Sequence, residues 1–407
     1  MAQPNRRFSR SAREQLATIA QREHRPDYQI VLFVGLLMLL GLVLMYAIGP
    51  QRANVLNALS GGDYYSDTYF VIKQVVSLVL AIGAFVALAM VPFTFLKRYA
   101  EQLVWIGLGL CILLYITGNV LQISQIAQCS LGACRWFELG PLGGFQPAEF
   151  LKFALLLYVA RFIGIRYQQD KLNDIHQTVW PVVGVALVSL FFVVVLQKDL
   201  GTGLAIASML FAMLVASGMK WSILGKIIAG GLILGVLSVL FFPHRMERIT
   251  TFLQGDNSTA QDAQDANYHI KNAKIALGTG GLLGLGIGNS VQATGYLPEA
   301  INDSVFAIIG ETFGFVGAVV VLIVFSALLI RLLRISDHLL DMPMRLAVAG
   351  VWGWLAAHVV LNIASMLGVF PLTGITLPLL SFGGTSMVFV AAALGLTFQL
   401  SRYTSHG

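Results

Sequence analysis

The segment Tyr296-Leu-Pro-Glu-Ala-Ile-Asn-Asp303 runs directly into the apolar stretch 304–330, SVFAIIGETFGFVGAVVVLIVFSALLI, and this junction decides the fold. An apolar stretch needs roughly 20 residues to cross a bilayer as a helix, and this one is longer. The carboxylates Glu299 and Asp303 therefore stand at the mouth of a membrane helix. Carboxylates placed at a bilayer surface make this junction the first place to look for chemistry on a lipid-linked substrate.

The chain as a whole is also strongly apolar. Hydrophobic residues make up 57% of it and charged residues 11%, and the mean hydropathy is +0.77. A soluble domain carries about 25% charged residues, so no separate soluble catalytic domain is expected. Backbone groups in lipid must be satisfied internally, and ten-residue alternating barrel strands are absent from the sequence. The sequence predicts an all-α polytopic membrane protein.

Ten apolar segments are long enough to be transmembrane helices. Polar residues interrupt the ends of the fourth, fifth and sixth. The predicted spans are 30–48, 69–91, 103–121, 148–164, 179–197, 201–217, 222–242, 304–330, 345–367 and 382–400.

The placement of lysine and arginine predicts the orientation, because cytoplasmic loops carry an excess of both. Both termini are predicted to be cytoplasmic, and the loops 49–68, 125–147 and 243–303 to lie outside. The net charge of +6 then reflects this bias and contact with anionic lipids rather than nucleic acid. The basic residues that set the orientation are Arg6, Arg7, Arg10, Arg13, Arg22, Arg25, Lys97, Arg98, Arg166, Lys171, Lys220, Arg331, Arg334, Arg345 and Arg402.

Three parts follow from this topology. Residues 1–27 are predicted to be a flexible basic cytoplasmic tail, since they are polar and show no apolar period. Residues 28–402 form the ten-helix membrane domain, which includes the large extracytoplasmic loop 243–303 between helices 7 and 8. Residues 403–407 are the cytoplasmic C-terminal end.

The three cysteines divide into two groups. Cys111 lies within an apolar span, where packing explains it. Cys129 and Cys134 lie in the second outer loop, where an oxidising exterior would allow a disulfide bond. Their spacing permits this bond without demanding it.

The large loop has three sections. Residues 254–267 are rich in Gly, Asp, Asn and Gln and are predicted to be mobile, and 268–277 to form a short amphipathic helix at the interface. The glycine run Gly278–Gly288 superficially resembles a nucleotide-binding loop but lacks a preceding strand. These glycines are predicted to let the backbone approach a substrate or another helix closely.

Several polar clusters are candidate binding sites. Glu149 falls in the first turn of a predicted helix and Lys152 lies three residues on, so the two could be an ion pair or part of a cationic wall for an anionic headgroup. The pair Lys198 and Asp199 is explained either by a turn or by substrate contact. The arginines after the seventh span suit phosphate, or else anchor the helix at the interface; they are Arg245 and Arg248.

Two further clusters flank the last three spans. Glu311 is expected two turns into the eighth span, where it could line one cavity with Asp303, about 80° away around the helix. Asp303 could alternatively serve as the N-cap. The prolines and glycines of Pro371–Ser386 break the backbone before the last span, which is tolerated only where it is buried or lines a wet cavity. His269 is expected at the surface, and no metal-ligand spacing occurs.

Four motifs in chain order resemble those of the shape, elongation, division and sporulation (SEDS) family, to which FtsW and RodA belong, with FtsW the closer. They are Trp136 with Gln146-Pro-Ala-Glu-Phe-Leu-Lys152, Gln197-Lys-Asp-Leu-Gly201, Tyr296-Leu-Pro-Glu-Ala-Ile-Asn-Asp303-Ser-Val-Phe-Ala307, and Leu377-Pro-Leu-Leu-Ser-Phe-Gly-Gly-Thr-Ser386. The resemblance spans about residues 28–402. The chain departs from the family at Lys198, at Ile301-Asn302 and at Ser304. These departures bear on substrate preference, since Asp303 is retained.

The resemblance implies a peptidoglycan glycosyltransferase of the bacterial inner membrane, at the division septum, that polymerises lipid II with release of undecaprenyl pyrophosphate. Asp303 would be the catalytic base, and Asp303 and Glu299 could hold a divalent cation, Mg²⁺ or Mn²⁺; no organic cofactor is implied. Implied partners are undecaprenyl-linked glycan, a class B penicillin-binding protein and other division proteins. The implied substrate-binding residues are Arg135, Trp136, Glu149, Lys152, Lys198, Asp199, Arg245, Arg248, Glu299, Ser381, Gly383 and Gly384.

Three alternatives stay open from the sequence. A lipid II flippase or other transporter would also have ten spans, intramembrane charges and broken helices, but it needs a polar path to the cytoplasm, and the inner turns offer little. A RodA-like elongation polymerase would share the reaction but not the setting. A scaffold that only activates a partner synthase would make the outer carboxylates dispensable.

Overall fold

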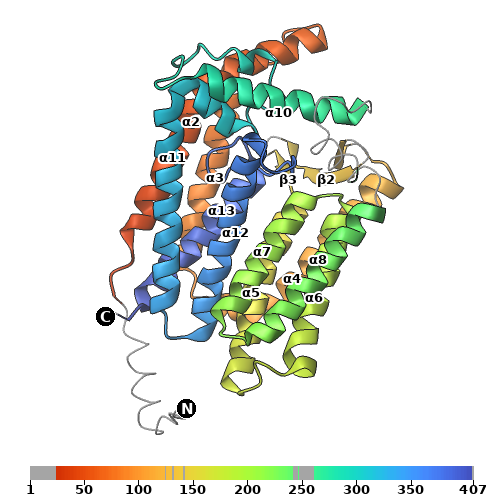
Figure 1. Ribbon diagram of the computed structural model, residues 1–407, viewed down its shortest axis with the longest axis vertical. Coiled ribbons are helices and arrows are strands. Elements are labelled where there is room, and N and C mark those ends of the chain that lie inside the picture. The colour runs from red at the N-terminus through yellow and green to blue at the C-terminus, as the bar shows by residue number, and fades with distance from the viewer. Residues whose placement is uncertain are drawn as a thin grey trace.

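The computed structural model describes residues 24–123, 125–130, 133–140, 143–241, 246 and 261–405 of the 407 residues. They form a bundle of long, roughly parallel and antiparallel helices with a small sheet and one crosswise helix at one end (Figure 1). The main helices are α2 (Tyr28–Ser60), α3 (Tyr69–Met90), α4 (Phe93–Tyr115), α5 (Pro147–Gln168), α6 (Trp180–Leu190), α7 (Leu200–Ala216), α8 (Trp221–Phe241), α10 (Gln261–Thr279), α11 (Val305–His338), α12 (Met342–Met366) and α13 (Gly384–Leu400).

Short helical turns extend several of these helices. Three are π-helical, namely η1 (Ile116–Val120) after α4, η3 (Ile175–Val179) before α6 and η4 (Phe191–Leu196) after it, and two are 3-10 turns, η6 (Gln292–Thr294) and η7 (Ser401–Tyr403). The structure is that of a polytopic helical membrane protein. Among the described residues, eight helical segments are long and apolar enough to cross a bilayer, judged by their length and composition.

Helices α5 and α7 occupy the positions of the fourth and sixth predicted spans but do not meet those criteria. Helix α7 is only 17 residues long. Helix α5 carries Glu149, Lys152, Arg161 and Arg166 along 22 residues. The count of ten spans therefore stays a prediction, and α5 is buried on most of its surface by its neighbours.

Both ends of the described chain lie at the same end of the bundle. The backbone N–H of His24 donates to the carbonyl of Arg402 at 2.8 Å, and that of Asp27 donates to Ser401 Oγ at 2.9 Å. Arg331, at the end of α11, forms an ion pair with Asp27. Helix α10 and strands β2 and β3 lie at the opposite end (Figure 1). The predicted tail falls almost wholly outside the described residues.

The predicted loop 49–68 is wrong in its first half, because α2 continues to Ser60. At about 1.5 Å per residue, 33 residues reach roughly 50 Å, well beyond a hydrocarbon core of about 30 Å. Pro50 lies inside this helix without ending it. The extension is held from the side, since Gln51 Nε2 donates to the carbonyl of Gly288 at 2.9 Å.

Helix α11 is kinked at Gly314, whose φ of 68° and ψ of −166° are non-helical. The glycine run fills the break: Phe315 N–H donates to Gly281 and Gly286 N–H donates to Thr312. A Cβ on Gly284 would lie 2.2 Å from the Thr312 carbonyl oxygen. The glycines therefore allow two backbones to meet, as the sequence predicted for a second helix, and they satisfy the groups that the kink frees.

The segment 125–147 contains an antiparallel sheet that the sequence analysis missed. Its strands are β1 (Ala127–Ser130), β2 (Ala133–Glu138) and β3 (Gly144–Phe145), in the order β1-β2-β3. Cys129 and Cys134 are paired in the register of β1 and β2 and form a disulfide bond, with Cα atoms 4.0 Å apart. The disulfide permitted by the sequence is thus present in the structure.

Helix α10 is longer than predicted. It begins at Gln261, so residues 261–267, predicted to be mobile, are helical. Gln and Ala favour a helix and Asp disfavours one only modestly, so the polar composition does not decide against a helix. The helix buries His269, Asn272, Ala273 and Ala276, which recur at helical spacing on one face, and leaves Lys271 exposed.

Candidate active site at the end of the bundle opposite the termini

The segment 371–386 between α12 and α13 is the centre of the candidate site. It has no regular structure before α13 begins at Gly384. Its backbone groups are bound by a side chain of α12, by the loop before α11 and by a hydroxyl within the segment itself. Residues 377–381 of this irregular stretch are buried, and its hydrogen bonds are made within the protein, which is the condition for irregular structure at membrane depth.

This segment is connected to the loop that carries Asp303 by one direct hydrogen bond and by a bridge through Asn362. The backbone N–H of Phe382 donates to the Ile301 carbonyl at 2.8 Å. Asn362 of α12, which is 1% exposed, donates from Nδ2 to the carbonyls of Asp303 and Ile375, both at 2.7 Å. One amide group thus joins the Asp303 loop, α12 and the 371–386 segment.

The start of α5 is joined to the same segment through Thr385. Its hydroxyl donates to the Gly144 carbonyl at 2.5 Å and accepts from the Gln146 backbone N–H at 3.3 Å. The side chain of Gln146 donates to Asp199 Oδ2 at 3.0 Å, which connects α5 to the start of α7. The first, second and last sequence motifs therefore meet in one hydrogen-bonded network.

Asp199 serves as the N-cap of α7. Its Oδ1 accepts from the Thr202 N–H at 2.9 Å and its Oδ2 from the Thr202 hydroxyl at 2.9 Å. Arg135 of β2 donates to the carbonyls of Gln197 and Lys198, at 3.2 and 2.9 Å. Lys198 has a φ of 52° and is exposed. This turn therefore has a structural explanation, while its two cations stay at the surface of the site.

Asp303 is 9% exposed and lies in the turn immediately before α11. The N-cap of α11 is Ser304, so the alternative interpretation of Asp303 as the N-cap is wrong. The loop is held through the Asp303 carbonyl and through neighbouring residues, as described above. The structure therefore fixes the backbone that presents this carboxylate.

Glu311 has a different role from the predicted one. It is fully buried, and its carboxylate accepts from Ser290 Oγ at 2.5 Å, from Val291 N–H at 3.0 Å and from Gln292 N–H at 3.2 Å. The prediction that it lines a cavity with Asp303 is wrong, because its oxygens hold the 290–292 turn. A buried carboxylate is stable there because backbone and hydroxyl donors replace water.

Glu149 and Lys152 form the ion pair that was one of the two predicted alternatives. The Lys152 ammonium is fully buried, 2.7 Å from Glu149 Oε1 and 3.2 Å from His358 Nε2. It also lies 4.4 Å from the ring centroid of Trp354. In this arrangement the ammonium neutralises a buried carboxylate, and a role as a cationic wall is a proposal that would require it to leave these partners.

Glu299 is exposed and adopts a left-handed φ of 49°. Its Oε2 accepts a hydrogen bond from the side chain of Asn302. Within the part of the chain that the structure describes, no three His, Cys, Asp or Glu side chains converge as a metal site. Two carboxylates nonetheless suit Mg²⁺, which commonly takes one or two from protein and the rest from substrate phosphate and water.

His269 was expected at the surface, and that prediction is wrong. It is 8% exposed, and its Nε2 lies 2.5 Å from Ser304 Oγ. Burial lowers the pKa of His269 to about 4, and the nearby carboxylate of Glu299 opposes this shift. The imidazole is therefore neutral at neutral pH and joins α10 to the Asp303 loop.

The remaining predicted residues have distinct positions. Ser381 is buried, and its Oγ accepts from the Leu377 N–H at 2.8 Å, which closes a turn in the central segment. Gly383 and Gly384 are the N-cap and first residue of α13. Trp136 is half-buried against Gly144 of the neighbouring strand β3. Two predicted residues, Arg245 and Arg248, lie outside the described residues.

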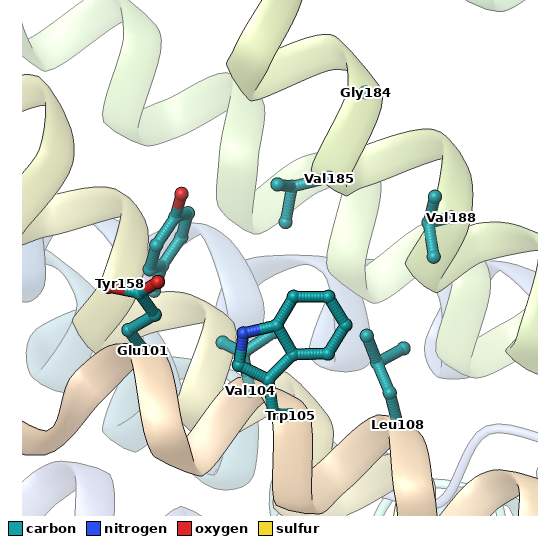
Figure 2. A pocket seen from close by; sticks show the side chains of 8 residues that line it. All are labelled: Glu101, Val104, Trp105, Leu108, Tyr158, Gly184, Val185 and Val188. Carbon is teal, nitrogen blue, oxygen red and sulfur yellow. The ribbon is translucent and has the colours of Figure 1, made fainter.

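A separate cavity of about 190 Å³ lies between α4, α5 and α6. Figure 2 shows Trp105 and Glu101 of α4 facing Tyr158 of α5 and Val185 of α6 across it. None of the predicted site residues lines it. It therefore contributes nothing to the candidate active site.

Sequence reasoning missed three residues of the network, namely His358, Asn362 and Thr385. The first two are polar residues four apart within an apolar span, and a polar side chain there is by default a functional or structural site. This spacing on one helix face was the available signal. No comparable signal distinguished Thr385 from other hydroxyl residues.

The fold and the network together define a class: a polytopic helical membrane protein with a buried carboxylate at the end of a kinked helix and a polar site at one end of the bundle. The family described as "Cell cycle protein", which comprises FtsW, RodA and SpoVE, matches residues 28–406 of this chain. The chain belongs to this family, and with it to a class of membrane glycosyltransferases.

Individual relatives agree over nearly the whole chain. The chain is 30% identical to stage V sporulation protein E of Bacillus subtilis (strain 168), over 94% of this chain and 98% of that protein. It is 30% identical to a probable peptidoglycan glycosyltransferase FtsW of Polynucleobacter necessarius subsp. necessarius (strain STIR1), over 97% of this chain and 90% of that protein.

Solved structures of the same fold are also similar. One belongs to work on structural coordination of polymerization and crosslinking by a peptidoglycan synthase complex, with a TM-score of 0.70, 26% identity and coverage of 93% of this chain and 98% of that one. The rod shape determining protein RodA of Thermus thermophilus gives a TM-score of 0.64 at 25% identity, over 94% of this chain and 98% of that one.

Proposed function

We propose that this protein polymerises lipid II into β1→4 glycan strands at the outer face of the bacterial cytoplasmic membrane, as a peptidoglycan glycosyltransferase. The observation that carries the proposal is the position of Asp303: a carboxylate at the mouth of α11, on a loop whose backbone is bound by Asn362 and Phe382. The name of the FtsW relative supports the substrate class.

The proposed reaction is a single inverting transfer. The 4-hydroxyl of the N-acetylglucosamine of one lipid II attacks C1 of the N-acetylmuramic acid at the reducing end of the growing chain. The new C1–O bond forms as the bond from C1 to the pyrophosphate oxygen breaks, and undecaprenyl pyrophosphate leaves with the electron pair. Asp303 takes the hydroxyl proton, a form of catalysis worth typically about 10²–10⁴-fold.

The developing charge on pyrophosphate needs positive partners, and no strong acid is required because pyrophosphate is a good leaving group. Arg135 and Lys198 are the cations that the described structure keeps at the surface of the site, next to the N-cap of α7. Arg245 and Arg248 are proposed to contribute from the loop after α8. A divalent cation held by Asp303 and Glu299 would neutralise the same charge.

Sugar and lipid contacts complete the proposed site. Trp136 would stack on a sugar face, and the backbone of Gly383 and Gly384 would lie close to substrate. The buried Glu149 and Lys152 and the half-buried Asp199 are proposed to contribute chiefly by holding the network in place. The prenyl chain would lie in a groove between helices that is open to lipid.

The proposed topology places this site at the extracytoplasmic face of the membrane. It has ten spans and cytoplasmic termini, with the loop after α8 extracytoplasmic, and this follows from the basic residues near the end where Asp27 meets Arg331. A class B penicillin-binding protein is the proposed partner, because one structurally similar chain comes from a synthase complex that couples polymerisation and crosslinking. A role at the division septum with other division proteins follows from the FtsW relatives.

The test is polymerisation of purified lipid II by the full-length protein with its transpeptidase partner. Asp303→Asn should lower the rate by a factor of about 10²–10⁴, because the amide cannot accept the proton. Asp337→Asn is the matched control: this exposed carboxylate lies near the end of α11 that is away from the site, 3.9 Å from Arg345, and its loss should leave the rate unchanged. Wild-type activity in a folded Asp303→Asn protein would remove Asp303 from the mechanism.

A further inference from the structure

Helix α10 lies across the Asp303 loop and presents one buried imidazole to it. His269 is on the buried face of the helix, beside Asn272 and Ala273, and is 8% exposed. Its Nε2 is 2.5 Å from the hydroxyl of Ser304, which is fully buried. The contact therefore joins a helix of the large loop to the residue that follows Asp303.

The direction of this hydrogen bond follows from the partners of the hydroxyl. Ser304 Oγ donates its only proton to the carbonyl of Pro298, 2.8 Å away. Its lone pairs then face His269, so the imidazole must donate from Nε2. The hydroxyl thus receives one bond from α10 and gives one to the other end of its own loop.

Ser304 is the residue that closes this loop. The bond to Pro298 closes residues 298–304 on themselves, and the 304 backbone N–H adds a bond to the Glu299 carbonyl at 3.2 Å. Other contacts fix this loop at Ile301, through Phe382, and at the Asp303 carbonyl, through Asn362. His269 supplies the contact from α10, at the end of the loop from which Asp303 is displayed.

We propose that His269 is a positioning residue for Asp303. By donating a hydrogen bond to Ser304, it fixes the hydroxyl that closes the 298–304 loop, and so fixes the direction of the catalytic carboxylate. The inference rests on the proposed function of Asp303 as the base. Displacement of a reacting group by about 1 Å can cost roughly 10²-fold in rate. The hydrogen bond between His269 and Ser304 can therefore affect turnover although His269 does not touch the substrate.

The experiment measures kcat and KM for lipid II with the full-length protein and its transpeptidase partner. His269→Ala is expected to lower kcat about tenfold or more while KM changes less than about threefold, because substrate contacts remain and the base is misdirected. His269→Gln should restore kcat to within about threefold of wild type, since its amide can donate in place of Nε2. Lys271→Ala, on the exposed face of the same helix, should have no effect.

Several outcomes overturn the inference. A folded His269→Ala protein with wild-type kcat shows that the contact is only structural, and a folded His269→Gln protein as slow as His269→Ala shows that hydrogen-bond donation is not the cause. If His269→Ala does not fold, Ser304→Ala decides, with the same loss of kcat expected and wild-type kcat contradicting it.

The two proposals fail separately. An inactive Asp303→Asn protein together with wild-type kcat in His269→Ala leaves the proposed function standing and removes only the role of His269. Activity retained in Asp303→Asn removes the proposed base and the positioning role with it. A double His269→Ala, Ser304→Ala variant should be no slower than either single variant, because both break one hydrogen bond.

Discussion

Asp303 and Glu311 are two buried carboxylates at the two ends of one short helical segment, and they differ in which of their atoms hold the surrounding structure. At Glu311 the carboxylate itself is bound, by Ser290 and by the backbone of the following turn. At Asp303 the bonds that hold the loop run through its carbonyl and its neighbours. Burial of an acid beside a membrane helix therefore does not by itself mark a candidate catalytic group, because a buried carboxylate such as Glu311 can serve to hold a turn.

The largest stability difference is expected between these two carboxylates. Glu311→Ala leaves the Ser290 hydroxyl and two backbone N–H groups without their acceptor, and each buried orphan costs about 1–3 kcal/mol, so the protein should lose about 3 kcal/mol or more. Asp303→Asn should change the free energy of unfolding by less than about 1 kcal/mol, because the amide keeps the shape of the carboxylate and the bonds of the neighbouring backbone remain.

Thermal unfolding in detergent, followed by fluorescence, compares the two variants directly. An Asp303→Asn protein as unstable as Glu311→Ala would erase the distinction, since the Asp303 carboxylate would then be a structural group as well.

A smaller effect is expected where the glycine run supports the Glu311 end. Gly284→Ala places a Cβ 2.2 Å from the Thr312 carbonyl oxygen at a φ of 83°, whereas Gly281→Ala meets open space at a φ of 54°. A left-handed alanine costs about 1–2 kcal/mol by itself. Both variants carry this cost, so the difference between their thermal midpoints of unfolding measures the clash of the Gly284→Ala Cβ with the Thr312 carbonyl. Gly284→Ala should be clearly the less stable of the two. Equal stability would show that α11 and the glycine run separate without cost.

A dependence of stability on pH is expected at the Asp303 end. Burial lowers the pKa of His269 from its ordinary 6.5 to about 4. Between pH 6.5 and pH 4 the imidazole is therefore protonated in the unfolded chain and neutral in the folded protein. Stability is therefore complete above about pH 6.5 and falls as pH drops toward 4, by at most about 3 kcal/mol.

Unfolding midpoints between pH 7 and 4, compared between wild type and His269→Gln, isolate this contribution. The variant should show a flatter profile over that range. Parallel profiles would contradict the burial of a neutral imidazole beside Ser304.

Part of the site was predictable because it depends on local chemistry. Pro147 and Glu149 specify the start of α5, and Lys152 follows at the spacing of an ion pair, as found. Ser304 is different, because the sequence shows it only as a departure from the family motif. Its structural role depends on a hydrogen bond with His269, 35 residues away. No local pattern reports which buried hydroxyl such an imidazole will meet.

The sequence by itself determined where apolar helices form, which polar motifs accompany them and that glycines allow a close backbone approach, since these follow from residue type and spacing along the chain. Only the tertiary structure decided that α2 continues past the predicted span, that Glu311 holds a turn and that Asn362 joins three segments. Those outcomes depend on which donors and acceptors meet when distant segments pack, and a buried polar group is defined by its partner rather than by its neighbours in sequence.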